Sequence, residues 1–144
     1  MNPHGGIVLL AGLLLTSAPG DDAVKKELAR LQGKWQTVSV EIDGRRLEKD
    51  FSEDRLIMKA NTFLLRAGMD SMQGVFTIDP TRTPKTIDEE VTAGAHKGTK
   101  VAGIYELDGD TLKVCYAHGK KERPKEFKTA PGSGLALVIY KRIK

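Results

Sequence analysis

The spacing of apolar residues changes at Gly33, and this change constrains the fold more than any other feature of the chain. Before Gly33, Val24, Leu28 and Leu31 recur at helical spacing, which predicts a short helix over residues 23–31. After Gly33 the apolar residues alternate with polar ones in short runs, as in half-buried strands. The predicted strands are residues 35–42, 55–59, 62–66, 74–79, 86–91, 100–107, 111–117 and 135–142.

Turn residues separate these runs. Asp43-Gly44 and Asp108-Gly109-Asp110 are typical of tight hairpins between antiparallel strands. The fold class is therefore predicted to be all-β: an antiparallel barrel of about eight strands with a short N-terminal helix, or else a sandwich. A barrel of eight strands has an interior filled by side chains or by one small ligand.

The first twenty residues are predicted to be a signal peptide. Residues 7–15 form an apolar run too short to span a bilayer, and small residues follow it before Pro19-Gly20. The stretch before the run has no Lys or Arg, which leaves an uncleaved anchor or a misassigned start codon as alternatives. The expected division is residues 1–20 as leader and residues 21–144 as an exported domain, periplasmic or extracellular, without stable membrane insertion after cleavage.

The charge pattern favours no nucleic-acid partner. The formal net charge is +4, and Glu122 and Glu126 are mixed into the densest basic stretch, which consists of Lys120, Lys121, Arg123 and Lys125. The single cysteine, Cys115, lies in an apolar strand pattern and is predicted to be a buried, inert thiol.

Specific segments resemble known proteins. Leu31-Gln32-Gly33-Lys34-Trp35 resembles the opening of lipocalin-like domains, where a short helix leads into Gly-x-Trp at the start of the first strand. The chain also resembles the uncharacterised lipocalin-like proteins abundant in planctomycete genomes, a family without an assigned activity. The matching segments are residues 31–40, 74–88, 103–116 and 122–134, which occur in this order along the chain.

The resemblance implies structural roles at one end of the barrel. In lipocalin-like barrels the first and last strands pair, and a cationic side chain of the last strand lies over the Trp of Gly-x-Trp. We therefore expect the Arg142 guanidinium, rather than Lys141, within about 6 Å of the Trp35 ring. Gly33 would then provide a tight entry of the chain into the first strand.

The interior of the predicted barrel is the candidate binding site. If Trp35 faces inward, strand alternation places Thr37, Ser39 and Glu41 on the same side. The apolar positions 38, 40 and 42 indicate the opposite orientation, so these two patterns conflict. The candidate lining residues are Trp35, Thr37, Ser39, Glu41, Tyr105 and Tyr116.

No local motif indicates catalysis or a metal site. Asp108 and Asp110 lack the further oxygen ligands of an EF-hand and are interpreted, with Gly109, as a hairpin turn. In the acidic run 88–90, Asp88 and Glu90 share one strand face and Glu89 points the other way, a pattern typical of a solvated edge. His96 and His118 lie in predicted loops without zinc-site spacing.

Three functional hypotheses follow. The first is an exported, non-enzymatic lipocalin-like domain that binds a small, partly apolar molecule without a cofactor. The second is a protein-interaction or cell-envelope module without a small ligand, which predicts an exposed apolar patch or a basic face around residues 120–128. The third is a hydrolase or isomerase that uses carboxylates such as Glu41 or Asp88.

Overall fold

The computed structural model describes residues 19–118 and 121–144 of the chain. The predicted leader, residues 1–20, lies outside the described residues except for Pro19 and Gly20, which begin the helix. The elements are α1 (Pro19–Leu31), β1 (Gly33–Ile42), β2 (Arg45–Arg46), β3 (Arg55–Lys59), β4 (Thr62–Ala67), β5 (Asp70–Asp79), β6 (Lys85–Gly94), β7 (Lys100–Asp108), β8 (Thr111–Ala117) and β9 (Leu135–Arg142).

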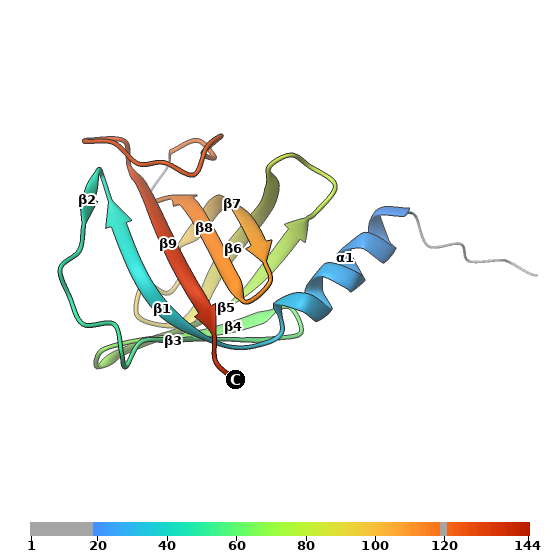
Figure 1. Cartoon of the computed structure of the whole chain (residues 1–144), viewed down its shortest axis with the longest axis horizontal. Helices are drawn as coiled ribbons and strands as arrows, with labels where there is room; N and C mark the ends of the chain where they lie inside the picture. The colour runs from blue at the N-terminus through green and yellow to red at the C-terminus, as the bar shows by residue number, and fades with distance from the viewer. Residues whose placement is uncertain (1–18, 119–120) are drawn as a thin grey trace, which may run out of the picture.

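The strands form one closed antiparallel sheet. Their order is β2-β1-β3-β4-β5-β6-β7-β8-β9, and β1 also pairs with β9, which closes a barrel of eight strands with β2 as a short addition (Figure 1). This confirms the predicted all-β, lipocalin-like barrel with a short N-terminal helix. β5 begins at Asp70 rather than at residue 74, because its polar first residues still pair with β4.

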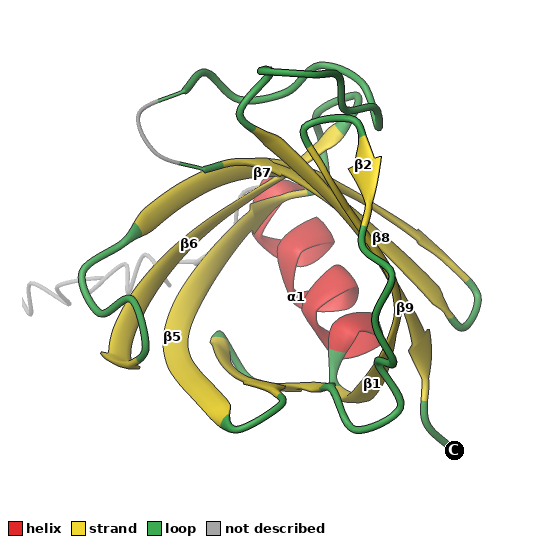
Figure 2. Ribbon diagram, turned by 90° about the vertical axis from the view of Figure 1, so that its left-hand side faces the viewer, coloured by secondary structure: helices red, strands yellow, loops and turns green. Residues whose placement is uncertain are grey.

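Helix α1 covers one end of the barrel, which we call the closed end. Leu31 is fully buried there, and Leu28 packs against the core. In Figure 2 the helix lies behind the barrel, and the opposite end faces the viewer. We call that opposite end the open end; the loop between β6 and β7 lies there.

A bulge in β1 resolves the conflict between the two patterns of its sequence. Thr37 pairs with Tyr140 and Ser39 pairs with Ile139, so the residue between them has no partner on β9. An extra residue reverses which side chains face inward beyond it. Thr37 is buried before the bulge, whereas Val40 packs against the core after it.

Ser39 and Glu41 therefore face outward, and their predicted place in the barrel interior is wrong. Glu41 accepts a hydrogen bond from the Thr129 hydroxyl on the outside of the barrel. The physical reason is the bulge, since strict alternation from Trp35 would have placed both side chains inside.

The core fills the closed half of the barrel. Its largest fully buried side chains include Trp35, Tyr105 and Phe76. Gly74 on β5 is required by close packing, because a Cβ there would lie 2.6 Å from the Phe63 ring and 2.1 Å from the Glu90 carbonyl oxygen. The lack of a side chain at Gly74 leaves room for the Phe63 ring inside the barrel.

A second, smaller buried region lies outside the barrel, under the segment 121–134. The outward-facing Cys115 is fully buried, and its thiol lies 3.9 Å from the Lys128 carbonyl oxygen. The Arg123 guanidinium donates hydrogen bonds to the Gly103 and Ile87 carbonyl oxygens at 2.8 and 3.2 Å. The prediction of a buried Cys115 thiol is confirmed, and burial raises the pKa of this thiol.

Candidate ligand cavity

A cavity of about 450 Å³ occupies the open half of the barrel. This volume lies within the range of small-molecule sites, roughly 300 to 1,000 Å³. Most of the wall is apolar and comes from every strand of the barrel. The apolar lining residues are Ile42, Leu56, Met58, Phe63, Leu65, Met72, Ile87, Val91, Val101, Leu112, Val114 and Ala136.

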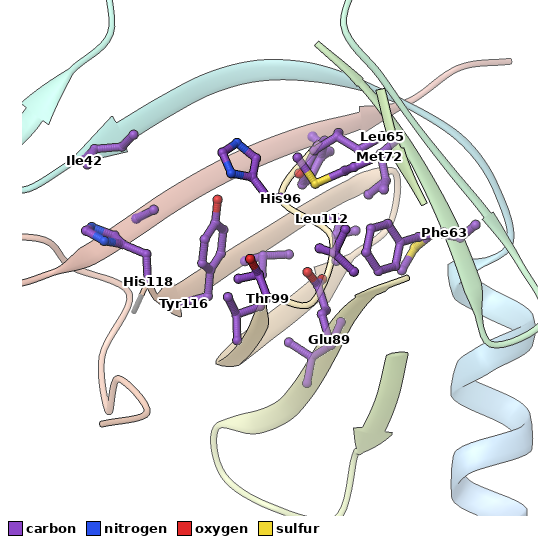
Figure 3. Close-up of a pocket in the computed structure, with 18 residues that line it drawn as sticks. Ile42, Phe63, Leu65, Met72, Glu89, His96, Thr99, Leu112, Tyr116 and His118 are labelled. Atoms are coloured by element: carbon purple, nitrogen blue, oxygen red, sulfur yellow. The ribbon is translucent and has the colours of Figure 1, made fainter. Parts of the chain in front are cut away.

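A few polar side chains share this cavity. Glu89, Tyr116 and His96 point into the same space, and His118 lies farther toward Ile42 (Figure 3). The polar lining residues are Glu89, His96, Thr99, Tyr116, His118 and Tyr140. Sparse polar groups on an apolar wall are the arrangement that orients a ligand while its apolar body is buried.

Glu89 is the acidic residue of the cavity. β6 places it between Ile87 and Val91 on the inner face, so the carboxyl is surrounded by apolar side chains. Burial raises the pKa of Glu89 to about 7, because the charged form loses its hydration. Among the residues that the structure describes, no Lys, Arg or His forms an ion pair with Glu89.

Two tyrosines add hydroxyl groups to the cavity. Burial, together with the charge of Glu89, raises the pKa of Tyr116 to about 12. Burial and the neighbouring Tyr116 and Glu89 raise the pKa of Tyr140 as well. Both hydroxyls therefore stay protonated at neutral pH and can donate hydrogen bonds.

The two histidines belong to the open end. His96 lies in the loop between β6 and β7 with a φ of 62°, and its side chain lines the cavity. His118 follows β8, and its Nε2 atom lies 3.8 Å from the Asp43 carboxylate. Both side chains are exposed, so they meet solvent as well as the cavity.

The closed end carries the Trp35 arrangement that the resemblance implies. The Arg142 guanidinium lies 4.2 Å from the centre of the Trp35 ring, which confirms the predicted stacking. Arg142 also donates hydrogen bonds to the carbonyl oxygens of Gln32 at 2.7 Å and Arg30 at 2.5 Å. It thus satisfies carbonyl groups at the C-terminus of α1 and joins the helix to β9.

Gly33 connects α1 to β1 in the way that the sequence predicts. Its φ of 117° lies in the region that favours glycine, and a Cβ there would sit 3.4 Å from the Arg142 guanidinium. The Trp35 indole nitrogen donates a hydrogen bond to the Leu31 carbonyl oxygen at 3.0 Å. Trp35 therefore acts as a structural residue and does not line the cavity.

A buried ion pair lies at the same closed end of the barrel. The Glu27 carboxylate is 2.8 Å from the Lys85 ammonium and 3.2 Å from the Arg30 guanidinium. Burial opposes ionisation of Glu27, but the hydrogen bond and charge of Lys85 outweigh it and hold the pKa of Glu27 below its usual range. Burial and the Glu27 charge raise the pKa of the adjacent Tyr105.

Of the six candidate lining residues, only Tyr116 reaches the cavity. Trp35, Thr37 and Tyr105 are buried elsewhere in the barrel, nearer the closed end, so their prediction as cavity residues is wrong. Strand alternation gave their inward orientation, but it carries no information on their depth along the barrel axis. Depth depends on which strands pair and with what stagger.

The sequence reasoning missed Glu89 and Tyr140 as cavity residues. A signal for Glu89 was present, since it shares its strand face with Ile87 and Val91 and is therefore an acid in the middle of an apolar face. Tyr140 likewise shares the inward face of β9 with Ala136 and Val138.

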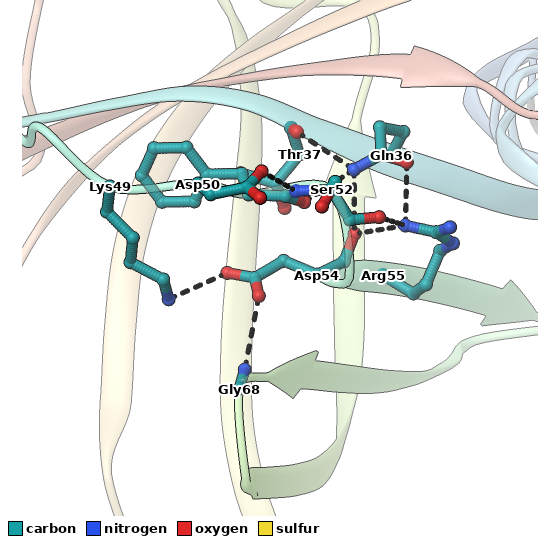
Figure 4. Close-up of polar contacts among 9 residues, drawn as sticks. Gln36, Thr37, Lys49, Asp50, Ser52, Asp54, Arg55 and Gly68 are labelled. Atoms are coloured by element: carbon teal, nitrogen blue, oxygen red, sulfur yellow. Dashed lines mark hydrogen bonds and ion pairs between the residues drawn. The ribbon is translucent and has the colours of Figure 1, made fainter.

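A polar network supports the side of the barrel where β1 and β3 separate. The buried Asp54 carboxylate lies 3.0 Å from the Lys49 ammonium and accepts a hydrogen bond from the Gly68 amide at 3.1 Å (Figure 4). Arg55 donates a hydrogen bond to the Gln36 side-chain oxygen at 2.6 Å. These contacts tie the connection between β2 and β3 to the turn after β4 and so stabilise the cavity wall.

The turn between β7 and β8 is a hairpin. Asp108 pairs with Thr111, and Gly109 has a φ of 56°, as a two-residue turn requires. Asp110 lies 3.1 Å from the Lys144 ammonium and 3.4 Å from the Arg142 guanidinium. Within residues 19–118 and 121–144, no group of three or more His, Cys, Asp or Glu side chains is placed to hold a metal ion.

The remaining acidic candidates are separate from the cavity. Asp88 lies on the outer face of β6, 2.7 Å from the Arg123 guanidinium, and Glu41 accepts its hydrogen bond from Thr129.

Comparison with family models, curated proteins and solved structures finds no match to the chain. No helix in the described part of the chain is long and apolar enough to cross a membrane.

Proposed function

We propose that this protein is an exported, non-enzymatic lipocalin-like domain that binds one small, partly apolar molecule inside its barrel. The observation that carries the proposal is the cavity of about 450 Å³, whose apolar wall holds a few polar groups. The leader pattern of residues 1–20 supports export. The Gly-x-Trp entry and the Trp35–Arg142 stack support membership of a lipocalin-like family.

The energetics of the cavity favour this function. Each Å² of apolar ligand surface removed from water contributes about 25 cal/mol, and the lining offers such contacts on all sides. The closed barrel also holds the walls in place before a ligand arrives, which lowers the entropic cost of binding. The hydroxyl groups of Tyr116 and Tyr140 can then select the ligand by its polar atoms.

Titration with a neutral fluorescent probe, N-phenyl-1-naphthylamine, tests the proposal. We expect saturable binding of one probe per chain with a rise in probe fluorescence. Ala136→Phe should abolish this signal, because Ala136 lines the cavity and a phenyl ring there takes up its volume. Ala29→Phe, on the exposed surface of α1, is the matched control and should bind as the unmodified protein does.

Thermal unfolding of both variants verifies that they are folded. Absence of saturable probe binding by the folded, unmodified protein would contradict the proposal. Equal binding by a folded Ala136→Phe variant would place the probe outside the barrel and would contradict it as well.

A further inference from the structure

The described residues that line the cavity include a carboxylic acid but no side chain with a permanent positive charge. Glu89 is its carboxylic acid, and no Lys or Arg is among the residues that line it. The elements around Glu89 contribute Tyr116 from β8, Tyr140 from β9, and His96 and His118 from the open end. The walls formed by β3, β4 and β5 are apolar. No described element therefore presents a permanent positive charge to the Glu89 carboxyl.

A carboxyl in such a place is costly to ionise. Without a cationic partner it loses hydration on burial and gains no compensating ion pair, which is why the pKa of Glu89 rises to about 7. By contrast, the buried Glu27 at the closed end has Lys85 and Arg30 beside it. The protein thus supplies partners to one buried acid and leaves the other facing the cavity.

We propose that the ligand of this cavity is a protonated amine with an apolar body, and that Glu89 binds the ammonium group. The inference rests on the proposed function, because it requires that the cavity holds a small molecule. The ammonium supplies the missing partner through a charge-assisted hydrogen bond. The rings of Tyr116, Tyr140 and Phe63, which line the same space, add favourable contacts to a cation.

The same arrangement disfavours an anionic ligand. A fatty-acid carboxylate would lie near the Glu89 carboxylate, and no lysine or arginine of the lining would compensate for the repulsion. A neutral alcohol would keep the apolar contacts and accept or donate hydrogen bonds, but it would gain no ion pair. Affinity should therefore follow the order amine, alcohol, carboxylate for a fixed apolar chain.

Displacement of N-phenyl-1-naphthylamine by three ten-carbon compounds at pH 8 measures this order. The compounds are decylamine, decan-1-ol and decanoate, which share the apolar chain and differ in the head group. Decylamine should bind roughly tenfold or more tightly than decan-1-ol, as is typical of hydrogen bonds to charged groups. Decanoate should bind most weakly.

Two variants assign the preference to Glu89. Glu89→Gln keeps the size and removes the charge, so it should reduce decylamine affinity to that of decan-1-ol while decan-1-ol binding is retained. Glu90→Gln removes the neighbouring acid, which is exposed on the outer face of β6, and should leave the preference unchanged.

The pH dependence provides a second readout. Alkylamines stay charged below about pH 10. The affinity for decylamine should therefore decrease as the pH falls below about 7 and Glu89 takes up a proton, and it should level off near the affinity of Glu89→Gln. His96 and His118 also line the cavity, so the pH dependence that remains in Glu89→Gln measures the contribution of groups other than Glu89.

The outcomes separate the two proposals. If decan-1-ol displaces the probe but decylamine binds no better, the amine inference is overturned and the binding function stands. The inference is likewise overturned if Glu89→Gln keeps the full preference for decylamine. If neither the probe nor any of the three compounds binds the folded protein, the proposed function fails and the inference fails with it.

Discussion

Each half of the barrel contains a carboxyl that is removed from water, and the pKa values of the two carboxyls are shifted in opposite directions. At the closed end Glu27 lies against Lys85 and Arg30, and its pKa is held below the usual range. In the open half Glu89 has apolar neighbours, and burial raises its pKa to about 7. The closed end is therefore organised for stability, whereas the open half keeps an unpaired polar group at a cost to stability.

The same contrast holds for packing. At the closed end Trp35 is completely buried between α1 and Arg142, and its indole nitrogen is hydrogen-bonded. In the open half Leu65 and Met72 are only partly buried, because they border the cavity. Side chains of the closed end should therefore contribute more to the free energy of unfolding than side chains of comparable type around the cavity.

The largest effect is expected from Trp35→Ala. Loss of the indole removes core packing, the hydrogen bond to Leu31 and the stack with Arg142, and should lower the free energy of unfolding by about 3 to 5 kcal/mol. Leu65→Ala, at the cavity wall, is the comparison and should cost about 1 kcal/mol, because this side chain is only partly buried. Urea denaturation measures both, and equal losses would remove the distinction between the two ends.

The next effect is a gain of stability in Glu89→Gln. The folded pKa of about 7 exceeds the ordinary value of 4.5, so the stability of the folded protein falls as the pH rises from 4.5, and the loss is complete above about 7. The shift corresponds to a gain of up to roughly 3 kcal/mol at pH 8 on neutralisation. The gain should shrink as the pH falls from 7 and should vanish below about 4.5, where the Glu89 carboxyl is protonated in both the folded and the unfolded state. Denaturation at several pH values tests this, and a gain that does not change with pH would refute the stated cause.

Lys85→Met should have an intermediate effect of the opposite sign. It leaves the buried Glu27 with the more exposed Arg30 as its cationic partner, and should cost about 1 to 3 kcal/mol at pH 7. The folded pKa of Glu27 lies below its unfolded value, so the stabilisation is present above about pH 4.5 and is lost as the pH falls through the lower folded pKa. The deficit of the variant, followed by denaturation, should therefore narrow in acid; a deficit that widens would contradict this assignment.

The smallest effect is expected from Arg142→Lys. Lysine keeps the positive charge but cannot reproduce the guanidinium that stacks on Trp35 and donates to two carbonyl groups of the helix end, so the loss should be about 1 kcal/mol. Trp35 is the single tryptophan of the chain, so its fluorescence reports this contact directly. Unchanged fluorescence emission and an unchanged free energy of unfolding would show that Arg142 contributes little to the stability of the closed end.

Much of the fold could be predicted from local patterns. The change of spacing at Gly33 predicted the helix and the first strand, and the Asp108-Gly109-Asp110 turn predicted the hairpin between β7 and β8. Gly-x-Trp and the closure of first and last strands together predicted the stack of Arg142 on Trp35. Each of these features depends on residues close in sequence or on a recurrent pairing of the two end strands.

The candidate site was predicted far less well, and β1 shows why. The bulge after Thr37 reverses the orientation of Ser39 and Glu41, and such an extra residue is defined by the partner strand rather than by β1 alone. An odd spacing between the inward-facing Trp35 and the apolar Val40 was its only trace in the sequence.

Periodicity and turn chemistry act locally, so the amino-acid sequence was sufficient to predict which segments form strands and where the hairpins turn. The contact between Trp35 and Arg142 followed from the resemblance to lipocalin-like domains. That Glu89 faces an open cavity, while Trp35, Thr37 and Tyr105 lie away from it, depends on how the strands are assembled into the barrel. Alternation along a strand specifies a face of the sheet. The depth of a side chain inside the barrel, and the partners available to its charge, are set by the stagger and closure of all eight strands together.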